Sequence, residues 1–290
     1  MAERCAICGG VLGRELLRIT VPDRFERHVG IAAEGYARSW VACEGCGAAT
    51  NVLAEGNRAK LDSIAAGYYE VDLAGGSVAD KFAKVMALPP ERSDNAQRVA
   101  RVAAFADTWL PPELASPRVL DIGAGTGVFL AKFLAQPGRR AWRGTGVEPD
   151  PAAAAHLRAL DRFTVVEGLF GPGSGLGAFD LVTLNKVVEH LPQPLALVRD
   201  AGGALDPARG LLYVELPDTL TVSHRPPSDN ILGALHCHLY DPSSVAALLA
   251  RAGLVALRIE RLFEPSGKIS VAAFAARPEA AAARAGGAGP

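Results

Sequence analysis

The chain has 290 residues, of which 49% are hydrophobic and 21% charged, with a formal net charge of -1. This length and balance predict a soluble globular protein with room for one large and one smaller domain. The near-neutral charge, without a run of lysine or arginine, argues against nucleic acid as a partner. No apolar run has the roughly 18 to 20 residues that a membrane span needs, and no secretory signal is recognisable, so we expect a cytoplasmic protein without membrane contact.

Four of the five cysteines form two Cys-x-x-Cys pairs, Cys5 with Cys8 and Cys43 with Cys46. Glycine follows each pair and permits the tight turn that lets both thiolates face one ion. Two such pairs supply a closed site of four thiolates, which predicts a structural zinc ion with no open position for a catalytic water. Disulfides or a redox pair are the alternatives, and a cytoplasmic chain without a thioredoxin-like context argues against both.

Residues 1–50 are therefore expected to form a zinc-binding module, and residues 51–117 a helical connector. The connector contains an amphipathic helix over residues 94–110, with Asp94 as its expected N-cap. The strands expected within the module cover residues 16–21 and 38–42.

A short apolar run further along is followed by three glycines at alternate positions, Gly123, Gly125 and Gly127. The pattern predicts a buried strand, a tight turn and a helix over residues 128–134. Glycine lets the backbone turn sharply and lets a ligand approach the main chain, so we interpret the turn as the floor of a nucleotide site. Glu148 ends the next expected strand, where a carboxylate can accept hydrogen bonds from ribose hydroxyls.

The spacing G-x-G-x-G argues against NAD, because Val128 stands where the dinucleotide fingerprint has its last glycine. The motif from Asp121 to Gly127 instead resembles the first motif of the class I S-adenosylmethionine (SAM) methyltransferases. The segments GVEPD and FDLVTLNKVVEHL resemble the second and fourth motifs of that family, in the correct order. The resemblance covers residues 118–275 and implies SAM as the cofactor. The residues expected around SAM are Asp121, Gly123, Ala124, Gly125, Gly127, Glu148, Pro149, Leu169, Phe170 and Asn185.

The same region alternates strands and helices, which predicts a parallel α/β sheet with helices on both faces. We therefore expect a Rossmann-like methyltransferase domain over residues 118–276, closed by an antiparallel hairpin as in the family it resembles. Residues 277–290, mostly alanine and glycine, are expected to be a disordered tail. The expected strands cover residues 118–122, 143–147, 163–167, 179–184, 210–215, 254–262 and 269–275, and the expected helices 127–135, 150–160, 194–205 and 242–252.

Three histidines follow the fourth and fifth expected strands, at the edge where open α/β sheets bind ligands. His190 lies in NKVVEHL, and His236 and His238 lie in HCHLY together with Tyr240. Histidine has a pKa suited to a general base, so these four residues are candidate catalytic groups, with a structural role as the alternative for each histidine. A second metal ion at His236 and His238 has little support, because no carboxylate or cysteine beyond Cys237 accompanies them.

A four-cysteine module before a domain with VVEHL and H-x-H-L-Y is similar to the deoxysugar C-methyltransferases, which act on nucleotide-linked keto sugars. This resemblance implies that His238 removes a proton beside a ketone while His190 supports the enolate. Cys237 departs from the family, which typically has glutamate at that position. We expect Tyr240 or Glu215 to orient His238. The residues expected near the acceptor or the pocket entrance are Tyr68, Tyr69, Lys186 and Glu215, with domain packing as the alternative for the two tyrosines.

Three other functions stay open. A small-molecule O- or N-methyltransferase differs only in its acceptor. A ribosomal-RNA methyltransferase can carry a zinc module, but it should have a basic surface. A zinc-ribbon scaffold with a degenerate SAM fold conflicts with the complete glycine motif and Glu148. The sequence defines neither the acceptor nor the oligomeric state.

Overall fold

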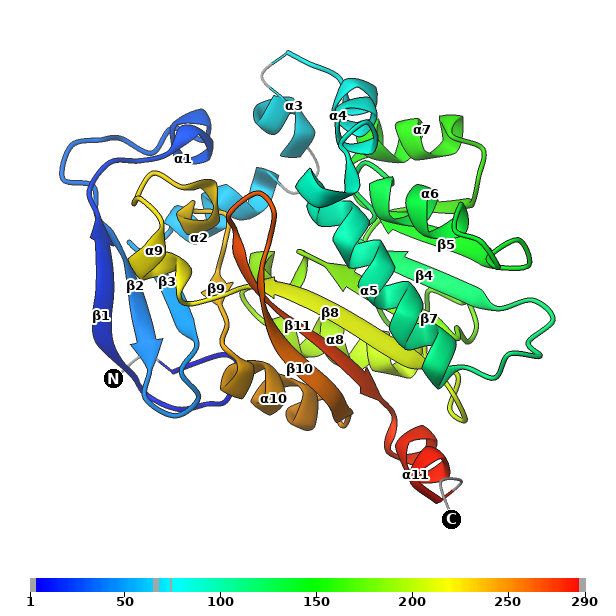
Figure 1. Cartoon of the computed structure of the whole chain (residues 1–290). Helices are drawn as coiled ribbons and strands as arrows, with labels where there is room; N and C mark the ends of the chain where they lie inside the picture. The colour runs from blue at the N-terminus through cyan, green and yellow to red at the C-terminus, as the bar shows by residue number, and fades with distance from the viewer. Residues whose placement is uncertain (1–3, 65–67, 74, 287–290) are drawn as a thin grey trace.

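The computed structural model describes residues 4–64, 68–73 and 75–286. Two sheets lie side by side in it, a four-stranded sheet near the N-terminus and a seven-stranded sheet at the centre (Figure 1). Within the described ranges, no helix has the length and apolar character required to cross a membrane.

The N-terminal sheet is an antiparallel meander with the order β1-β2-β3-β9. Its core contains the fully buried Trp40 together with Ile19 and Leu61, and also Leu232 and Leu239 from much later in the chain. The N-terminal module is therefore completed by a distant segment. Its first three strands are β1 (Leu12–Ile19), β2 (Arg38–Cys43) and β3 (Ala49–Leu53).

Several helices join this module to the central sheet, and the sequence analysis anticipated only the last of them. That helix is capped by Ser93, whose hydroxyl accepts a hydrogen bond from the Ala96 N–H at 3.1 Å. The predicted cap, Asp94, is wrong by one position, and its carboxylate instead binds Ser266. The joining helices are α2 (Asn57–Asp62), α3 (Tyr68–Leu73), α4 (Val78–Met86), the 3₁₀ turn η2 (Pro90–Arg92) and α5 (Asp94–Trp109). A further helix, α1 (Arg24–His28), lies within the module between β1 and β2.

The central sheet has the order β10-β11-β8-β7-β4-β5-β6, and β11 is antiparallel to both of its neighbours. This arrangement confirms the predicted Rossmann-like sheet with its closing hairpin, and each predicted strand boundary lies within a few residues of the observed one. The strands are β4 (Arg118–Ile122), β5 (Arg143–Glu148), β6 (Thr164–Glu167), β7 (Leu181–Asn185), β8 (Leu211–Pro217), β10 (Val255–Phe263) and β11 (Ile269–Ala276).

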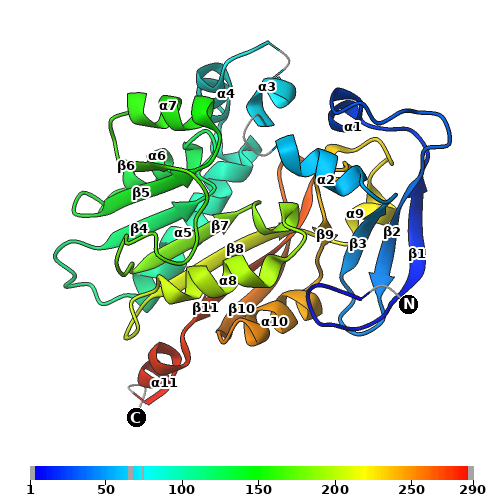
Figure 2. The ribbon, with the colours of Figure 1, turned by 180° about the vertical axis from the view of Figure 1, so that it is seen from behind.

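Helices cover both faces of this sheet because its central strands are apolar on both sides. Strand β8 shows the alternation: Tyr213 packs in the cluster beneath α5, and Val214 packs in the cluster of the opposite face. Helix α5 lies over one face in Figure 1, and α8 comes forward on the other face in Figure 2. The remaining helices are α6 (Val128–Leu134), α7 (Pro151–Ala159), η3 (Val188–His190), α8 (Pro194–Gly203), α9 (Thr221–His224), η4 (Asn230–Leu232) and α10 (Pro242–Arg251).

Two parts of the chain differ from the prediction. Residues His238–Leu239 form the short strand β9, which pairs with β3 and places His238 opposite Thr50. The expected disorder of the tail is wrong for Pro278–Gly286, which forms helix α11, in keeping with the high helix propensity of its alanines. Residues 287–290 of the predicted tail lie outside the described part of the chain.

Candidate functional site

A cavity of about 750 Å³ opens at the carboxyl ends of β4, β5 and β7. Open α/β sheets bind their ligands at this edge. One part of the wall comes from the glycine turn after β4, and another from the helices of the N-terminal half, including Arg58, Leu61 and Tyr68. The predicted site residues that line this cavity are Tyr68, Tyr69, Asp121, Gly123, Ala124, Gly125, Glu148, Pro149, Leu169, Phe170, Asn185, Lys186 and His190.

Backbone hydrogen bonds hold the glycine turn against β5. The N–H groups of Gly123 and Ala124 both donate to the Val147 carbonyl, at 2.8 and 3.0 Å. Gly125 has a φ of +57° and its N–H donates to Oε2 of Glu148 at 2.7 Å. A Cβ on Gly125 would lie 2.8 Å from the hydroxyl of Tyr69 in α3. Helix α3 therefore packs close to the turn on one side, while Gly125 also lines the cavity.

Gly127 has a different role from the one predicted. It does not line the cavity, and a Cβ there would lie 2.5 Å from Cδ2 of Leu157 in α7. Its φ of +79° places it at the N-cap of α6. Gly127 therefore allows close packing of the turn against a neighbouring helix, whereas Thr126, which the sequence analysis did not single out, lines the cavity.

The two carboxylates of the turn have unusual surroundings. Glu148 is 5% exposed, and its Oε1 accepts a hydrogen bond from the Asp150 N–H at 2.9 Å; burial raises its pKa. Asp121 is 1% exposed and accepts bonds from Thr183 at 2.6 Å and Asn185 at 2.8 Å. Burial raises the pKa of Asp121 to about 7, and these two hydrogen bonds offset only part of that effect.

The apolar residues that the sequence analysis expected after the third strand of the central sheet lie at the cavity. Leu169 and Phe170 follow β6 and both line the cavity; Leu169 is 81% exposed, which is unusual for a large apolar side chain. An exposed leucine beside an open cavity is suited to cover the face of a planar ring.

Lys186 and Glu215 belong to a buried ion cluster. The Lys186 ammonium lies 3.1 Å from Glu264 and 3.6 Å from Glu215, while Arg98 binds Glu215 at 2.5 Å. Burial alone would raise the pKa of Glu215, but Arg98 and Lys186 hold it below its usual range. Lys186 lines the cavity and has a φ of +59°, whereas Glu215 does not line it, so direct contact of Glu215 with the acceptor is not supported.

The histidines separate into two groups. His190 lines the cavity, and its Nδ1 lies 3.2 Å from the Leu235 carbonyl. His238 is 2% exposed and outside the cavity, with Nδ1 at 3.3 Å from the Thr50 hydroxyl and Nε2 at 3.3 Å from the Pro192 carbonyl. Burial lowers the pKa of both imidazoles to about 4, so both are neutral near pH 7. The predicted position of His238 at the ligand site is therefore wrong, and of these two histidines only His190 lines the cavity.

Two further predicted catalytic groups also lie away from the cavity. His236 packs against His190, with ring centroids 4.6 Å apart, and does not line the cavity itself. Tyr240 is fully buried, in the cluster that includes residues of α10. Tyr240 packs edge-on against the His238 ring, with centroids 6.2 Å apart, whereas the hydrogen bonds of that ring go to Thr50 and Pro192 and not to Tyr240 or Glu215.

Tyr68 satisfies both roles proposed for it. It lines the cavity, stacks on Phe25 of the N-terminal module at 5.7 Å and lies edge-on to His190 at 6.4 Å. Arg58 and Leu61 on α2 form part of the same wall, and sequence reasoning missed them because it expected no helix there. Arg58 binds the Ala234 carbonyl at 3.0 Å, which ties this wall to the segment before β9.

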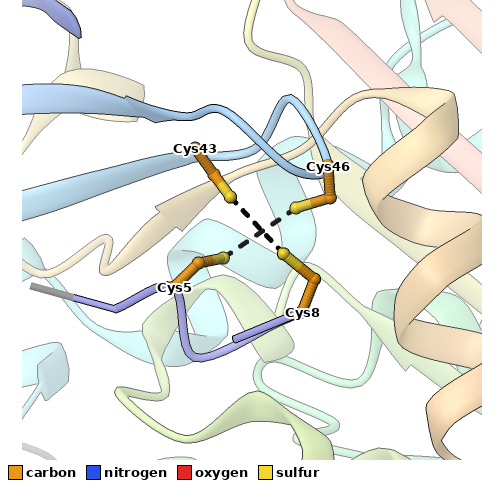
Figure 3. Close-up of side chains that lie close together, drawn as sticks. All are labelled: Cys5, Cys8, Cys43 and Cys46. Atoms are coloured by element: carbon orange, nitrogen blue, oxygen red, sulfur yellow. Dashed lines mark hydrogen bonds between the residues drawn. The ribbon is translucent and has the colours of Figure 1, made fainter. Parts of the chain in front are cut away.

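The four paired cysteines converge on one point, two from the N-terminal segment and two from the turn between β2 and β3 (Figure 3). Their sulfur atoms lie within 4.8 Å of one another, with Cys5 to Cys46 at 3.9 Å and Cys8 to Cys43 at 3.4 Å. Four thiolates around zinc at about 2.3 Å would stand about 3.8 Å apart, whereas a disulfide needs about 2.05 Å. All five cysteines are free in this structure, and the spacing of the four clustered sulfurs fits a tetrahedral metal ion better than disulfides.

The comparisons with known proteins agree with this architecture. The family described as "Methyltransferase domain" matches residues 92–259, more than half of the sequence, so the chain belongs to this methyltransferase family. Among solved structures, magnesium protoporphyrin IX methyltransferase from Synechocystis PCC 6803 with bound SAH has a TM-score of 0.55 at 15% identity, covering 74% of this chain and 99% of that one. This second likeness concerns the fold alone.

Two curated relatives are similar over a shorter stretch. The ubiquinone biosynthesis O-methyltransferase of Xanthomonas euvesicatoria pv. vesicatoria (strain 85-10) is 32% identical over 114 residues, covering 37% of this chain and 46% of the relative. The corresponding protein of Vibrio parahaemolyticus serotype O3:K6 (strain RIMD 2210633) is 28% identical over 104 residues, covering 34% and 43%. The chain thus spans less than half the length of the curated relatives that it matches.

Proposed function

We propose that this chain transfers a methyl group from SAM to a small molecule, with both reactants in the cavity at the edge of the central sheet. The observation that carries this proposal is that one cavity joins the glycine turn to a second wall made by the N-terminal half. Its volume of about 750 Å³ lies in the range of small-molecule sites. RNA as the acceptor has no support in the net charge of -1.

SAM occupies the glycine end in this proposal. Glu148 meets the ribose hydroxyls and the exposed Leu169 covers the adenine. Asp121 and Asn185 are polar groups available to the methionine end. The methyl carbon of SAM is already activated by the sulfonium, so the protein mainly holds the acceptor in line with it.

The acceptor occupies the end around Tyr68 and His190. The Leu235 carbonyl can only accept a hydrogen bond, so Nδ1 of the neutral His190 donates and Nε2 carries the lone pair. We infer that the group that assists proton loss from the acceptor lies at this end of the cavity, where the Nε2 lone pair of His190 is available. His238 instead acts as a bridge between β3 and the Pro192 carbonyl.

The cysteine cluster holds a structural zinc ion in this proposal. The Gly10 and Gly45 N–H groups each donate to a cysteine sulfur at 3.3 Å, as suits thiolates that carry negative charge. Zinc would supply folding energy to a small sheet, and with four thiolates it leaves no position for chemistry.

A nucleotide-linked keto sugar is the acceptor that the zinc module and the VVEHL and H-x-H-L-Y segments favour by resemblance. His238 lies outside the cavity, which favours a second candidate acceptor, a small hydroxylated molecule that is methylated on oxygen. The two curated relatives are named as O-methyltransferases. A hydroxyl needs less help in losing its proton than a carbon does.

The test supplies radiolabelled SAM with two acceptor panels, nucleotide-linked keto sugars and phenolic or other hydroxylated small molecules. Label transferred to either panel, together with SAM binding by calorimetry, supports the proposal. Exchange of the hydrogen on the acceptor carbon for deuterium in deuterated water identifies carbon methylation. Methyl transfer without this exchange supports methylation on a heteroatom such as oxygen. Failure to bind SAM would refute the enzymatic proposal and favour the scaffold.

A further inference from the structure

Three metal-ligating side chains gather at the acceptor end of the cavity, away from the cysteine cluster. Glu189 and His190 lie in the 3₁₀ turn η3 (Val188–His190), and His236 lies in the loop before β9. One oxygen or nitrogen atom of each lies within 4.8 Å of the others. The two segments are fixed together by Cys237, whose N–H donates to the Glu189 carbonyl at 2.6 Å and whose thiol donates to the His190 carbonyl at 3.2 Å.

Both imidazoles have the orientation of metal ligands. Nδ1 of His190 lies 3.2 Å from the Leu235 carbonyl, and Nδ1 of His236 lies 2.5 Å from the Ile231 carbonyl. A carbonyl can only accept, so each neutral ring donates through Nδ1 and keeps its lone pair on Nε2. Histidines that bind metal ions commonly donate their other ring N–H to a backbone carbonyl in this way.

The carboxylate supplies an independent observation. Glu189 is 1% exposed, and its Oε2 is buried with no hydrogen-bond partner among the described residues. A buried polar atom without a partner is costly, so this oxygen is available to a ligand. The nearest cation in sequence, Lys186, is already engaged with Glu264, Ser270 and Glu215.

We propose that Glu189, His190 and His236 bind a divalent first-row transition-metal ion. Two imidazoles and one carboxylate suit zinc, iron or cobalt, and three protein ligands leave coordination positions open. Of the three ligands only His190 lines the cavity, so in this proposal an acceptor oxygen reaches the ion from the side of His190. Metal binding stands on the cluster alone, and only this contact with the acceptor rests on the proposed function. This site would thus have open coordination positions, whereas the cysteine cluster with four thiolates has none.

The experiment adds Co²⁺ to the purified protein of residues 1–290, keeping the zinc of the cysteine cluster in place. We expect one further equivalent of Co²⁺, measured by equilibrium dialysis and elemental analysis, with weak visible d–d bands and no thiolate charge-transfer band. Glu189→Gln and His236→Gln should each weaken this binding by roughly 100-fold or more, because each removes a ligand. The exposed His224, changed to Gln, is the matched control and should leave binding unchanged.

Circular dichroism and the zinc content of the cysteine cluster establish that each variant is folded, and Glu189→Asp, which keeps a carboxylate, should retain more Co²⁺ than Glu189→Gln. No further equivalent in the unchanged protein would overturn the site. Full binding in both ligand variants, or a thiolate band in the cobalt spectrum, would overturn it as well. SAM titration of the same samples separates the proposals: cobalt binding without SAM binding removes the proposed function alone, and the reverse removes this site alone.

Discussion

The two ends of the cavity are built in different ways. The glycine end comes from one β-turn-α unit and the end of the neighbouring strand, and backbone bonds from Gly123 and Ala124 to Val147 hold it together. The histidine end joins residues 189–190 to the loop before β9, and that loop is held by the N-terminal module through β3 and Arg58. The glycine end is thus local in sequence, whereas the histidine end depends on contacts between segments almost 200 residues apart.

This difference suggests how a methyltransferase of this type changes its acceptor. The central sheet can keep one cofactor site while an added module reshapes the opposite wall of the cavity. Phe25, Arg58 and Leu61 all reach the acceptor end from the N-terminal half, directly or through Tyr68. Disturbing the module should therefore affect the acceptor end more than the glycine end.

The largest expected effect follows from Cys43→Ser. Loss of one thiolate should release the zinc ion and with it on the order of 10 kcal/mol of metal-binding free energy. We expect no bound zinc, a lower Tm and acceptor turnover reduced far more than SAM affinity. Cys237→Ser is the control for zinc content, because this thiol lies outside the cluster and bonds to the His190 carbonyl. Equal losses of acceptor turnover and SAM affinity would contradict the claim that the module supports one end of the cavity more than the other.

Gly125→Val should act at the other end. The residue has φ +57°, which costs a side chain about 1–2 kcal/mol, and a Cβ would lie 2.8 Å from the Tyr69 hydroxyl, which adds about 1–3 kcal/mol of overpacking. We expect calorimetry to detect no SAM binding. Gly138→Val also has a positive φ, +80°, with nothing within 4 Å of a Cβ, so it measures the backbone strain alone and should keep SAM affinity.

His190→Gln and His238→Gln test the division of the histidines. Removing the cavity imidazole should lower turnover by about 10²- to 10⁴-fold while SAM affinity hardly changes. His238→Gln should instead lower the free energy of unfolding by about 1–3 kcal/mol, because it disturbs buried hydrogen bonds to Thr50 and Pro192. A large loss of turnover in His238→Gln with unchanged stability would restore the role that the sequence analysis gave to His238.

The sequence analysis predicted the central sheet well because its signals are local. Apolar strands and the glycine turn are each determined within a few residues, whereas the one predicted helix cap, Asp94, is wrong by one position. The cysteine spacing is also local within each pair, so the cluster could be predicted before the two pairs were seen together.

The histidine end could not be predicted in the same way. Which face His238 presents depends on the pairing of β9 with β3, and a strand of two residues gives no periodic signal. Helices α2 and α3, which carry Arg58 and Tyr68 to the cavity, are too short for a recognisable apolar repeat. The missed residues are those whose positions follow from tertiary contacts.

Glu148→Ala probes the glycine end more gently than Gly125→Val. It removes the acceptor of the Gly125 N–H and the expected partner of the ribose, so SAM affinity should fall by about 1–3 kcal/mol. Glu167→Ala is the matched control, since this carboxylate ends the adjacent strand β6, lies outside the cavity and pairs with Arg158 at the surface. Equal SAM affinity in the two variants would contradict the assignment of Glu148.

The smallest expected effect is the pH dependence of stability that Asp121 contributes. Its pKa is about 7 in the native protein against 3.8 in the reference state, so between these values the unfolded chain has lost a proton that the native protein keeps. The free energy of unfolding therefore falls as the pH rises toward about 7, and the loss is complete above that value. Asp121→Asn cannot titrate, so its stability relative to the unchanged protein should rise by roughly 1 kcal/mol from about pH 6 to about pH 8. Denaturant unfolding without SAM at the two pH values measures this, and parallel changes in both proteins would show that the carboxylate is already ionised in the native state.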